Sequence, residues 1–241
     1  DKKACTLLER IVQSRFTAVS PERSTLPSPS TGRPDREPCW FVCNNLLLLL
    51  LKILRYQKDV SKEDQEHIVV SAKDIAVCLL KSSFDKSLVW VQLGLLLLHF
   101  KCYKEAQSAF FAAFTANPSC NVALINLGLA FQLNGEDDEA MFVYNKVVVV
   151  LPDSYQAFNN MGNIFLKQGL FDQALQSYRQ ALRCKPDFAM ALNNVGLVYC
   201  LQGKQEEALK SFESCLDIHK DYGPAVANKQ VLQKRMVAAS M

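Results

Sequence analysis

Side-chain amides recur at one spacing in this sequence, and they are the residues best suited to recognise another molecule. An amide carries a hydrogen-bond donor and an acceptor, so it can bond a carbonyl and an N–H group of a peptide backbone at once. The row therefore predicts a surface that grips an extended polypeptide whatever its side chains are. An alternative stays open, in which each amide bonds only the backbone of the neighbouring structural unit. The members, which follow one another at a constant interval, are Gln92, Asn126, Asn160 and Asn194.

Residues that could carry catalysis are poorly placed for it. The three histidines, His67, His99 and His219, are far apart, and none has a cysteine or serine at a spacing typical of a nucleophile and its base. No G-x-x-x-x-G-K phosphate-binding motif is present. Cys39 and Cys43 lie one helical turn apart without a histidine pair nearby, which argues against a zinc site. We therefore expect no enzyme activity, no metal and no cofactor.

Composition narrows the class of partner. The 241 residues carry 27 Lys and Arg against 24 Asp and Glu, and this net charge of +3 is too weak for a nucleic-acid-binding surface. The nine cysteines are scattered, which is typical of reduced thiols, so we expect an intracellular, cytoplasmic location. The apolar stretch 40–56 contains Asn44, Asn45 and Lys52, so we expect no membrane span. Because the sequence begins with Asp1, we expect a fragment or processed product that can lack an N-terminal targeting signal.

The amides belong to a longer internal repeat with a 34-residue period. Four glycines mark the period, and each is followed by alanine twelve positions later and by an aromatic residue sixteen positions later. Small residues let two antiparallel helices approach closely, and the aromatic residues fill the space beside that contact. A further glycine ends the first helix in three copies, where a left-handed residue is wanted. These columns are Gly94, Gly128, Gly162 and Gly196; Ala106, Ala140, Ala174 and Ala208; Phe110, Tyr144, Tyr178 and Phe212; and Gly135, Gly169 and Gly203.

This pattern resembles the tetratricopeptide repeat, with four consecutive copies in register. The resemblance implies an all-α fold, a right-handed α-solenoid of helix–turn–helix units. A proline-rich segment and other helical patterns flank the copies. The expected order is an N-terminal amphipathic helix (1–19), a Pro/Ser-rich linker (20–38), a degenerate helical hairpin (39–86), the four repeats (87–120, 121–154, 155–188 and 189–222) and a C-terminal capping helix (223–241).

The resemblance also implies that peptides lie along a concave wall made by the first helix of each repeat. The early part of the expected wall is apolar and the late part is rich in amides. An apolar wall of that size needs a cover, either residues 2–19 of the chain itself or a partner. The expected peptide-binding group is Gln92, Asn126, Asn159, Asn160, Asn163, Lys167, Asn193 and Asn194, and the expected apolar group is Leu88, Val91, Leu95, Leu98, Val122, Ile125 and Leu129.

A second candidate contact closes the second helix of the second copy. Residues 147–151 are four valines and a leucine, more than packing needs, and valine is a mediocre helix former. We expect Val148 and Val149 to face outward on the convex side and to contact a partner. The sequence thus predicts a non-catalytic scaffold or adaptor for a protein or extended peptide within a larger intracellular assembly. The alternative is the targeting or regulatory arm of an enzyme whose catalytic domain lies outside this sequence.

Overall fold

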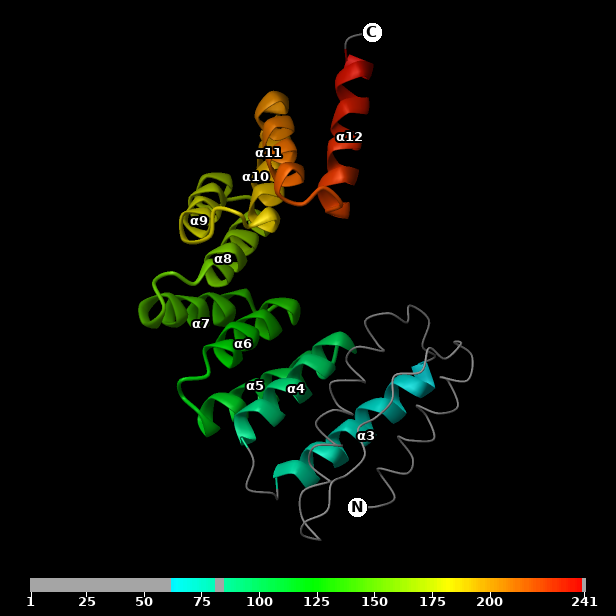
Figure 1. Cartoon of the computed structure of the whole chain (residues 1–241), viewed down its shortest axis with the longest axis vertical. Helices are drawn as coiled ribbons and strands as arrows, with labels where there is room; N and C mark the ends of the chain where they lie inside the picture. The colour runs from blue at the N-terminus through cyan, green and yellow to red at the C-terminus, as the bar shows by residue number, and fades with distance from the viewer. Residues whose placement is uncertain (1–61, 81–84, 240–241) are drawn as a thin grey trace, which may run out of the picture. The chain divides into compact units, whose positions relative to one another are not determined.

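The computed structural model describes residues 62–80 and 85–239, and every regular element in this part of the chain is an α-helix (Figure 1). The expected helix over 1–19, the linker over 20–38 and the apolar stretch 40–56 lie outside the described residues. The helices are α3 (Lys62–Leu80), α4 (Lys86–His99), α5 (Tyr103–Ala116), α6 (Asn121–Leu133), α7 (Asp137–Val150), α8 (Tyr155–Lys167), α9 (Phe171–Cys184), α10 (Ala189–Leu201), α11 (Gln205–Ile218) and α12 (Gly223–Ala239).

The chain divides into two compact units, and the division falls within α6. Unit 1 is Asp1–Ala123 and unit 2 is Leu124–Met241. Within unit 1, α3 packs on α4 and α4 packs on α5. Within unit 2, each helix from α7 to α11 packs on the next, and α12 packs on both α10 and α11. Consecutive helices therefore pair into hairpins, and neighbouring hairpins of unit 2 stack on one another.

The turns inside the hairpins use the left-handed backbone that the glycine column predicts. Gly135, Gly169 and Gly203 have φ angles of 86°, 75° and 76°. Lys101 takes the same place in the first repeat with a φ of 61°, although it carries a side chain. A left-handed residue after a helix lets the chain reverse while its amide bonds the last turn. The prediction of glycine-terminated first helices is confirmed.

The larger glycine column marks the closest approach of the two helices of a hairpin. A methyl group added to Gly162 would lie 2.5 Å from the ring of Tyr178, and one added to Gly94 would lie 2.6 Å from the ring of Phe110. Gly128 meets Tyr144 in the same way at 2.5 Å. The four aromatic side chains of this column are fully buried, as are the four alanines. The fold is therefore the predicted all-α arrangement of helix–turn–helix repeats.

The last helix, α12, continues the repeat on one of its faces only. Ala225 and Leu232 stand one repeat period after the buried Ala191 and Val198, and they are buried too. The face that packs a second helix in the other repeats is different. The positions that are apolar, glycine and apolar or aromatic in the four repeats are held on α12 by Lys229, Gln230 and Gln233. Accordingly, α12 packs on the preceding hairpin and carries polar residues where a second helix would otherwise lie.

Candidate binding surface

One face of α8 and of α10 carries a row of residues that are half-buried or exposed. Its members are spaced by four, three and four positions, so they lie along a single side of the helix. We name this face the outer stripe. On α10 the end residues Met190 and Leu201 are 43% and 62% exposed. The stripe is Gln156, Asn160, Asn163 and Lys167 on α8, and Met190, Asn194, Leu197 and Leu201 on α10.

The asparagines of these stripes bond to one another across the hairpins. The side-chain amide of Asn194 donates to Asn163 Oδ1 at 3.0 Å and to Asn159 Oδ1 at 3.2 Å, which joins α10 to α8. The amide of Asn159 donates to Asn160 Oδ1 at 3.4 Å. Both N–H groups of the Asn194 side chain are therefore hydrogen-bonded within the protein. The alternative of internal bonding, left open by the sequence, describes this residue better, although its partners are side chains and not backbone.

The same network extends to α12. Asn228 lies one repeat period after Asn194, and its amide donates to Asn193 Oδ1 at 2.9 Å. Asn193 in turn donates to Asn194 Oδ1 at 3.3 Å. The sequence prediction stopped the amide row at Asn194, yet the period carried forward once more would have found Asn228. An unbroken set of amide contacts thus links α8, α10 and α12.

Two buried tyrosines complete the network from the second helices. The hydroxyl of Tyr178 donates to Asn163 Oδ1 at 2.8 Å, and that of Tyr144 donates to Gln132 Oε1 at 3.2 Å. Burial raises the pKa of both phenols, and a hydrogen bond from Asn160 to Tyr144 opposes the rise only in part. Both tyrosines therefore stay neutral and act as hydrogen-bond groups.

Three of the expected wall residues do not face the solvent. Val91, Asn159 and Asn193, each three positions before a repeat glycine, are only 6%, 1% and 4% exposed. Their column lies about 60° around the helix from the outer stripe, on the side turned toward a neighbouring helix. The expectation that they line an open wall is corrected here, because a partner cannot reach a buried side chain.

Other expected wall residues are only partly available. Gln92, Leu95 and Leu98 on α4 are half-buried, and so are Asn126, Ile125 and Leu129 on α6. Leu88 and Val122 are exposed. Lys167 is exposed, but its ammonium lies 2.7 Å from Asp137 Oδ2 of α7, so it is already paired.

Exposed apolar residues that the sequence prediction missed lie five positions after the repeat glycines. Leu133 and Leu201 hold this position and are 48% and 62% exposed. The sequence could have revealed this column, because it follows the first residue of the outer stripe by close to three helical turns and so lies on the same side of the helix. Lys167 belongs to the same column and was found only for its charge.

The outer side of α7 presents a second apolar surface. Val149 is 78% exposed and Val150 is 65% exposed, whereas Val148 is half-buried and Val147 is buried. Phe142, two turns earlier, is 63% exposed, and the ammonium of Lys146 lies 5.3 Å from its ring centroid. We name Phe142, Val149 and Val150 the α7 stripe. Val149 is exposed as expected, whereas Val148, which was expected to face outward beside it, is only half-exposed; Val150 and Phe142 are exposed as well.

The sequence matches known repeat families over most of unit 2. Residues 162–203 match a family described as TPR repeat, and residues 122–154 and 188–221 match two families described as tetratricopeptide repeat. These matches fall on the repeating units seen in the structure. This chain contains tetratricopeptide repeats. Proteins with such repeats generally mediate protein–protein interactions and the assembly of complexes, and they are typically non-catalytic.

Solved structures show the same fold at low sequence identity. PilF of Pseudomonas aeruginosa is 23% identical with a TM-score of 0.57, over 63% of this chain and 69% of PilF. YrrB, described as a TPR protein with an unusual peptide-binding site, is 21% identical with a TM-score of 0.50, over 78% of this chain and 91% of YrrB. A chain of the Cut9–Hcn1 hetero-tetramer of the APC/C is 18% identical with a TM-score of 0.62, over 82% of the present chain and 41% of the chain in that complex. A search of curated proteins found no match.

The chain has no cluster of three or more metal-ligating side chains within its described residues. Cys39 and Cys43 lie outside that part. Cys102, Cys120, Cys184, Cys200 and Cys215 are free thiols. Burial raises the pKa of Cys102, Cys200 and Cys215. A raised pKa keeps a thiol protonated and weakly nucleophilic. Among the helices that the structure describes, none combines the length and apolar character needed to cross a membrane.

Proposed function

We propose that this protein is a non-catalytic scaffold that holds a partner polypeptide along the outer stripe of α10, as a subunit of a larger assembly. The exposure of Met190 and Leu201, at the two ends of the stripe, carries the proposal. The two side chains stand about 16 Å apart along the helix. A segment lying along α10 would bury both, and a few well-buried apolar anchors supply most of the free energy of such contacts.

In this proposal the asparagines act mainly as positioning residues. Asn194 lies between the two apolar ends, and its bonds to Asn159 and Asn163 hold α10 against α8. A partly buried network of hydrogen-bonded amides fixes the relative placement of the helices that carry it. The stripe is then a preformed surface, which lowers the ordering cost of binding. The peptide-binding site described for YrrB supports the idea that this fold can hold a peptide.

The α7 stripe is proposed as a second contact of the same scaffold. The repeat does not require apolar residues there, because Arg183 and Asp217 occupy the position of Val149 one and two repeats later. Phe142 corresponds in the same way to Gln176. Exposed apolar residues at positions that are polar in later repeats, as at Val149 and Phe142, are typical of a surface that another protein covers.

A selection experiment tests the α10 contact while the partner is still unidentified. Peptides are selected from a display library on the full chain, and their Kd values are measured by fluorescence anisotropy. In the variant Met190→Ser/Leu201→Ser we expect the Kd to rise about tenfold or more, because two apolar anchors are lost. The matched control is Ile218→Ser, since Ile218 on α11 is 44% exposed and lies off the stripe.

The melting temperature of both variants should stay near that of the parent, because exposed side chains contribute little to folding. Selected peptides that bind the double variant with unchanged Kd would contradict the α10 contact. A loss of binding in Ile218→Ser of equal size would show that the effect is not specific to the stripe.

A further inference from the structure

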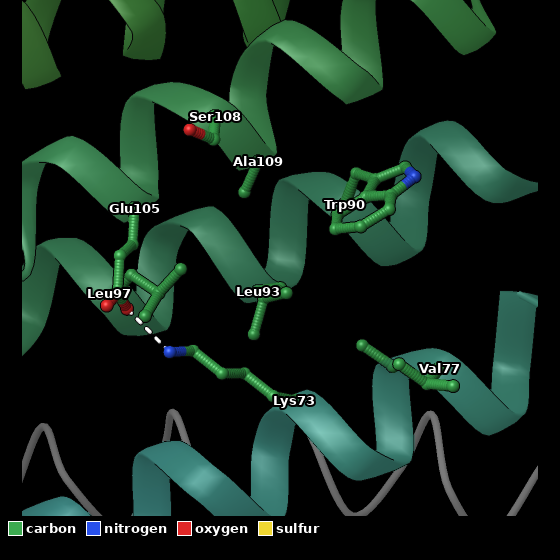
Figure 2. A pocket seen from close by; sticks show the side chains of 9 residues that line it. Lys73, Val77, Trp90, Leu93, Leu97, Glu105, Ser108 and Ala109 are labelled. Atoms are coloured by element: carbon green, nitrogen blue, oxygen red, sulfur yellow. Dashed lines mark ion pairs between the residues drawn. The ribbon is translucent and has the colours of Figure 1, made fainter.

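A cavity of about 370 Å³ lies within unit 1, between α3, α4 and α5 (Figure 2). Its walls are mainly apolar side chains of the three helices. Figure 2 shows the ion pair of Lys73 and Glu105 at one end of the cavity, with 2.7 Å between Nζ and Oε2, and Trp90 and Val77 toward the other end. Neither the family pattern nor the outer stripe of unit 2 accounts for this space.

The cavity exists because a small residue stands where the repeats hold a large one. The buried Ala72 lies one repeat period before Ala106 of the alanine column, which sets the register of α3. In that register Ala76 precedes Phe110 by one period, so it belongs to the column that is aromatic in all four repeats. In unit 2 the same position holds Tyr178, whose ring is fully buried against neighbouring core residues.

Neighbouring positions add to the space. Lys73 stands where unit 2 has Leu175, and Leu97 stands where unit 2 has Tyr199. In unit 2, Leu175 and Tyr199 belong to one apolar cluster. Trp90 is larger than the leucine at its position in unit 2, and its indole borders the cavity. Ordinary packing of adjacent repeats therefore fills this place, and unit 1 leaves it open.

The size and lining define what the cavity can take. An apolar cavity of about 150 Å³ already binds benzene, so about 370 Å³ accepts a bicyclic ring or a ring with an attached chain. Among the described residues that line it, Lys73 and Glu105 carry the charges. They pair with each other at one end of the cavity, so the group inserted beside them is uncharged, but their side chains remain 42% and 52% exposed and accessible from outside. Lys73 belongs to α3 and Glu105 to α5, which makes the two sides of the opening positive and negative respectively.

The surface beside the cavity extends along α3. Val70 and Val77, one turn before and one turn after Lys73, are 58% and 50% exposed. Three positions on one helical face thus alternate apolar, basic and apolar. A free small molecule would fill the cavity without burying both valines. An amphipathic helix lying beside α3 would bury both valines and fill the cavity at the same time.

We propose that this cavity receives one bulky apolar side chain, such as Trp or Phe, from a helical segment of a partner protein. The segment carries an acidic residue that faces Lys73 and a basic residue that faces Glu105, which sets its direction along the groove. This site lies in unit 1 and is independent of the proposed function of α10 in unit 2. Variants of the two units therefore report on each surface separately.

The first experiment tests the cavity with indole as the probe, using ligand-detected NMR on the full chain. We expect saturable indole binding by the parent and none by Ala76→Phe, which restores the aromatic residue of the repeat column. Filling the cavity should leave the melting temperature equal or higher. The matched control is Ala238→Phe on the exposed end of α12, which should bind indole as the parent does.

A parent that fails to bind indole, together with a clear fall of the melting temperature in Ala76→Phe, would overturn the proposal, because other residues of the chain would then occupy the space. Self-association of the parent that Ala76→Phe abolishes, measured by sedimentation velocity, would also overturn it, since a second copy would then be the occupant.

The second experiment tests the partner with peptides selected from a helical display library. We expect peptides with an aromatic residue flanked by opposite charges, displaced by indole and insensitive to Met190→Ser/Leu201→Ser. The double swap Lys73→Glu/Glu105→Lys keeps the ion pair but reverses its direction, so we expect it to weaken these peptides at least fivefold. Indole binding without any indole-displaced peptide, or peptides indifferent to the swap, would overturn the assignment to an oriented helical segment.

Discussion

Unit 1 and the last two repeats of unit 2 share the contact inside each hairpin but differ in what lies between hairpins. Gly94 meets Phe110 in unit 1 as closely as Gly162 meets Tyr178 in unit 2. In unit 2, aromatic rings and amide bonds fill the space between adjacent repeats, whereas unit 1 keeps an apolar cavity between α3 and the α4–α5 hairpin, with an ion pair at its edge. The hairpin is thus the constant element of this chain, and the space between hairpins is where its surfaces diverge.

Substitutions at the glycine column should affect both units alike and have the largest effect. We expect Gly162→Ala and Gly94→Ala each to lower the free energy of unfolding by about 3 kcal/mol, because the new methyl group overlaps a buried ring. Urea denaturation followed by circular dichroism measures the change. Gly223→Ala is the control, since nothing lies within 4 Å of a methyl group there. An equal loss in the control would show that backbone freedom, and not ring contact, explains the glycines.

Loss of an amide side chain should affect the stability of the two units differently. Asn194→Ala removes three hydrogen bonds and leaves buried groups of Asn159 and Asn193 without partners, so we expect a loss of about 2 kcal/mol. Gln92 holds the same column in unit 1, and its buried Oε1 has no hydrogen-bond partner among the described residues. We therefore expect Gln92→Leu to be neutral or stabilising. Equal losses at both positions, measured by urea denaturation, would erase this difference between the units.

Alkaline pH should weaken unit 2 through its buried tyrosines. Burial raises the pKa of Tyr178 above the ordinary value of about 10, so the unfolded chain ionises first. The contribution of this residue is intact below pH 10 and falls as pH rises above it, by about 1 kcal/mol at pH 10.5.

The variant Tyr178→Phe should therefore lose less stability between pH 9 and pH 10.5 than the parent does, as measured by urea titrations at each pH. Tyr178→Phe will itself cost about 1 kcal/mol at pH 7, because the hydroxyl bonds Asn163. The slope with pH, and not the absolute value, decides the outcome. Identical slopes would mean that the phenol is not shielded from water.

The smallest effect on folding is expected at the α7 stripe. Val149→Lys/Val150→Lys should change the free energy of unfolding by no more than about 0.5 kcal/mol, since both side chains are largely exposed. The same change at the buried Val147 should unfold the repeat, which makes it the matched contrast. Thermal denaturation distinguishes the two. A large loss in the double variant would place these valines in the packing and remove the α7 stripe as a contact surface.

Much of the fold follows from local rules that a sequence displays directly. The repeat period, the glycine turns and the glycine–aromatic pairs each depend on residues within one hairpin, so their spacing was enough to predict them. The candidate site was predicted less well. Asn159 and Asn193 were expected to be open but are buried, and Leu201 was overlooked although it is exposed.

The failures have a common physical origin. Helical periodicity says which residues share one side of a helix, as it does for Met190 and Leu201, but not which side the next hairpin covers. Whether Asn194 bonds a visiting peptide or its neighbour Asn163 depends on how closely α8 and α10 approach, and this is a property of two hairpins together.

The chain's residue order alone was sufficient for the hairpins, because each is held by contacts between residues less than one repeat period apart. The packed structure was needed for the amide network across α8, α10 and α12 and for the cavity beside Ala76. Both arise where side chains from outside a single hairpin meet, and the volume left there is set by every residue that borders it.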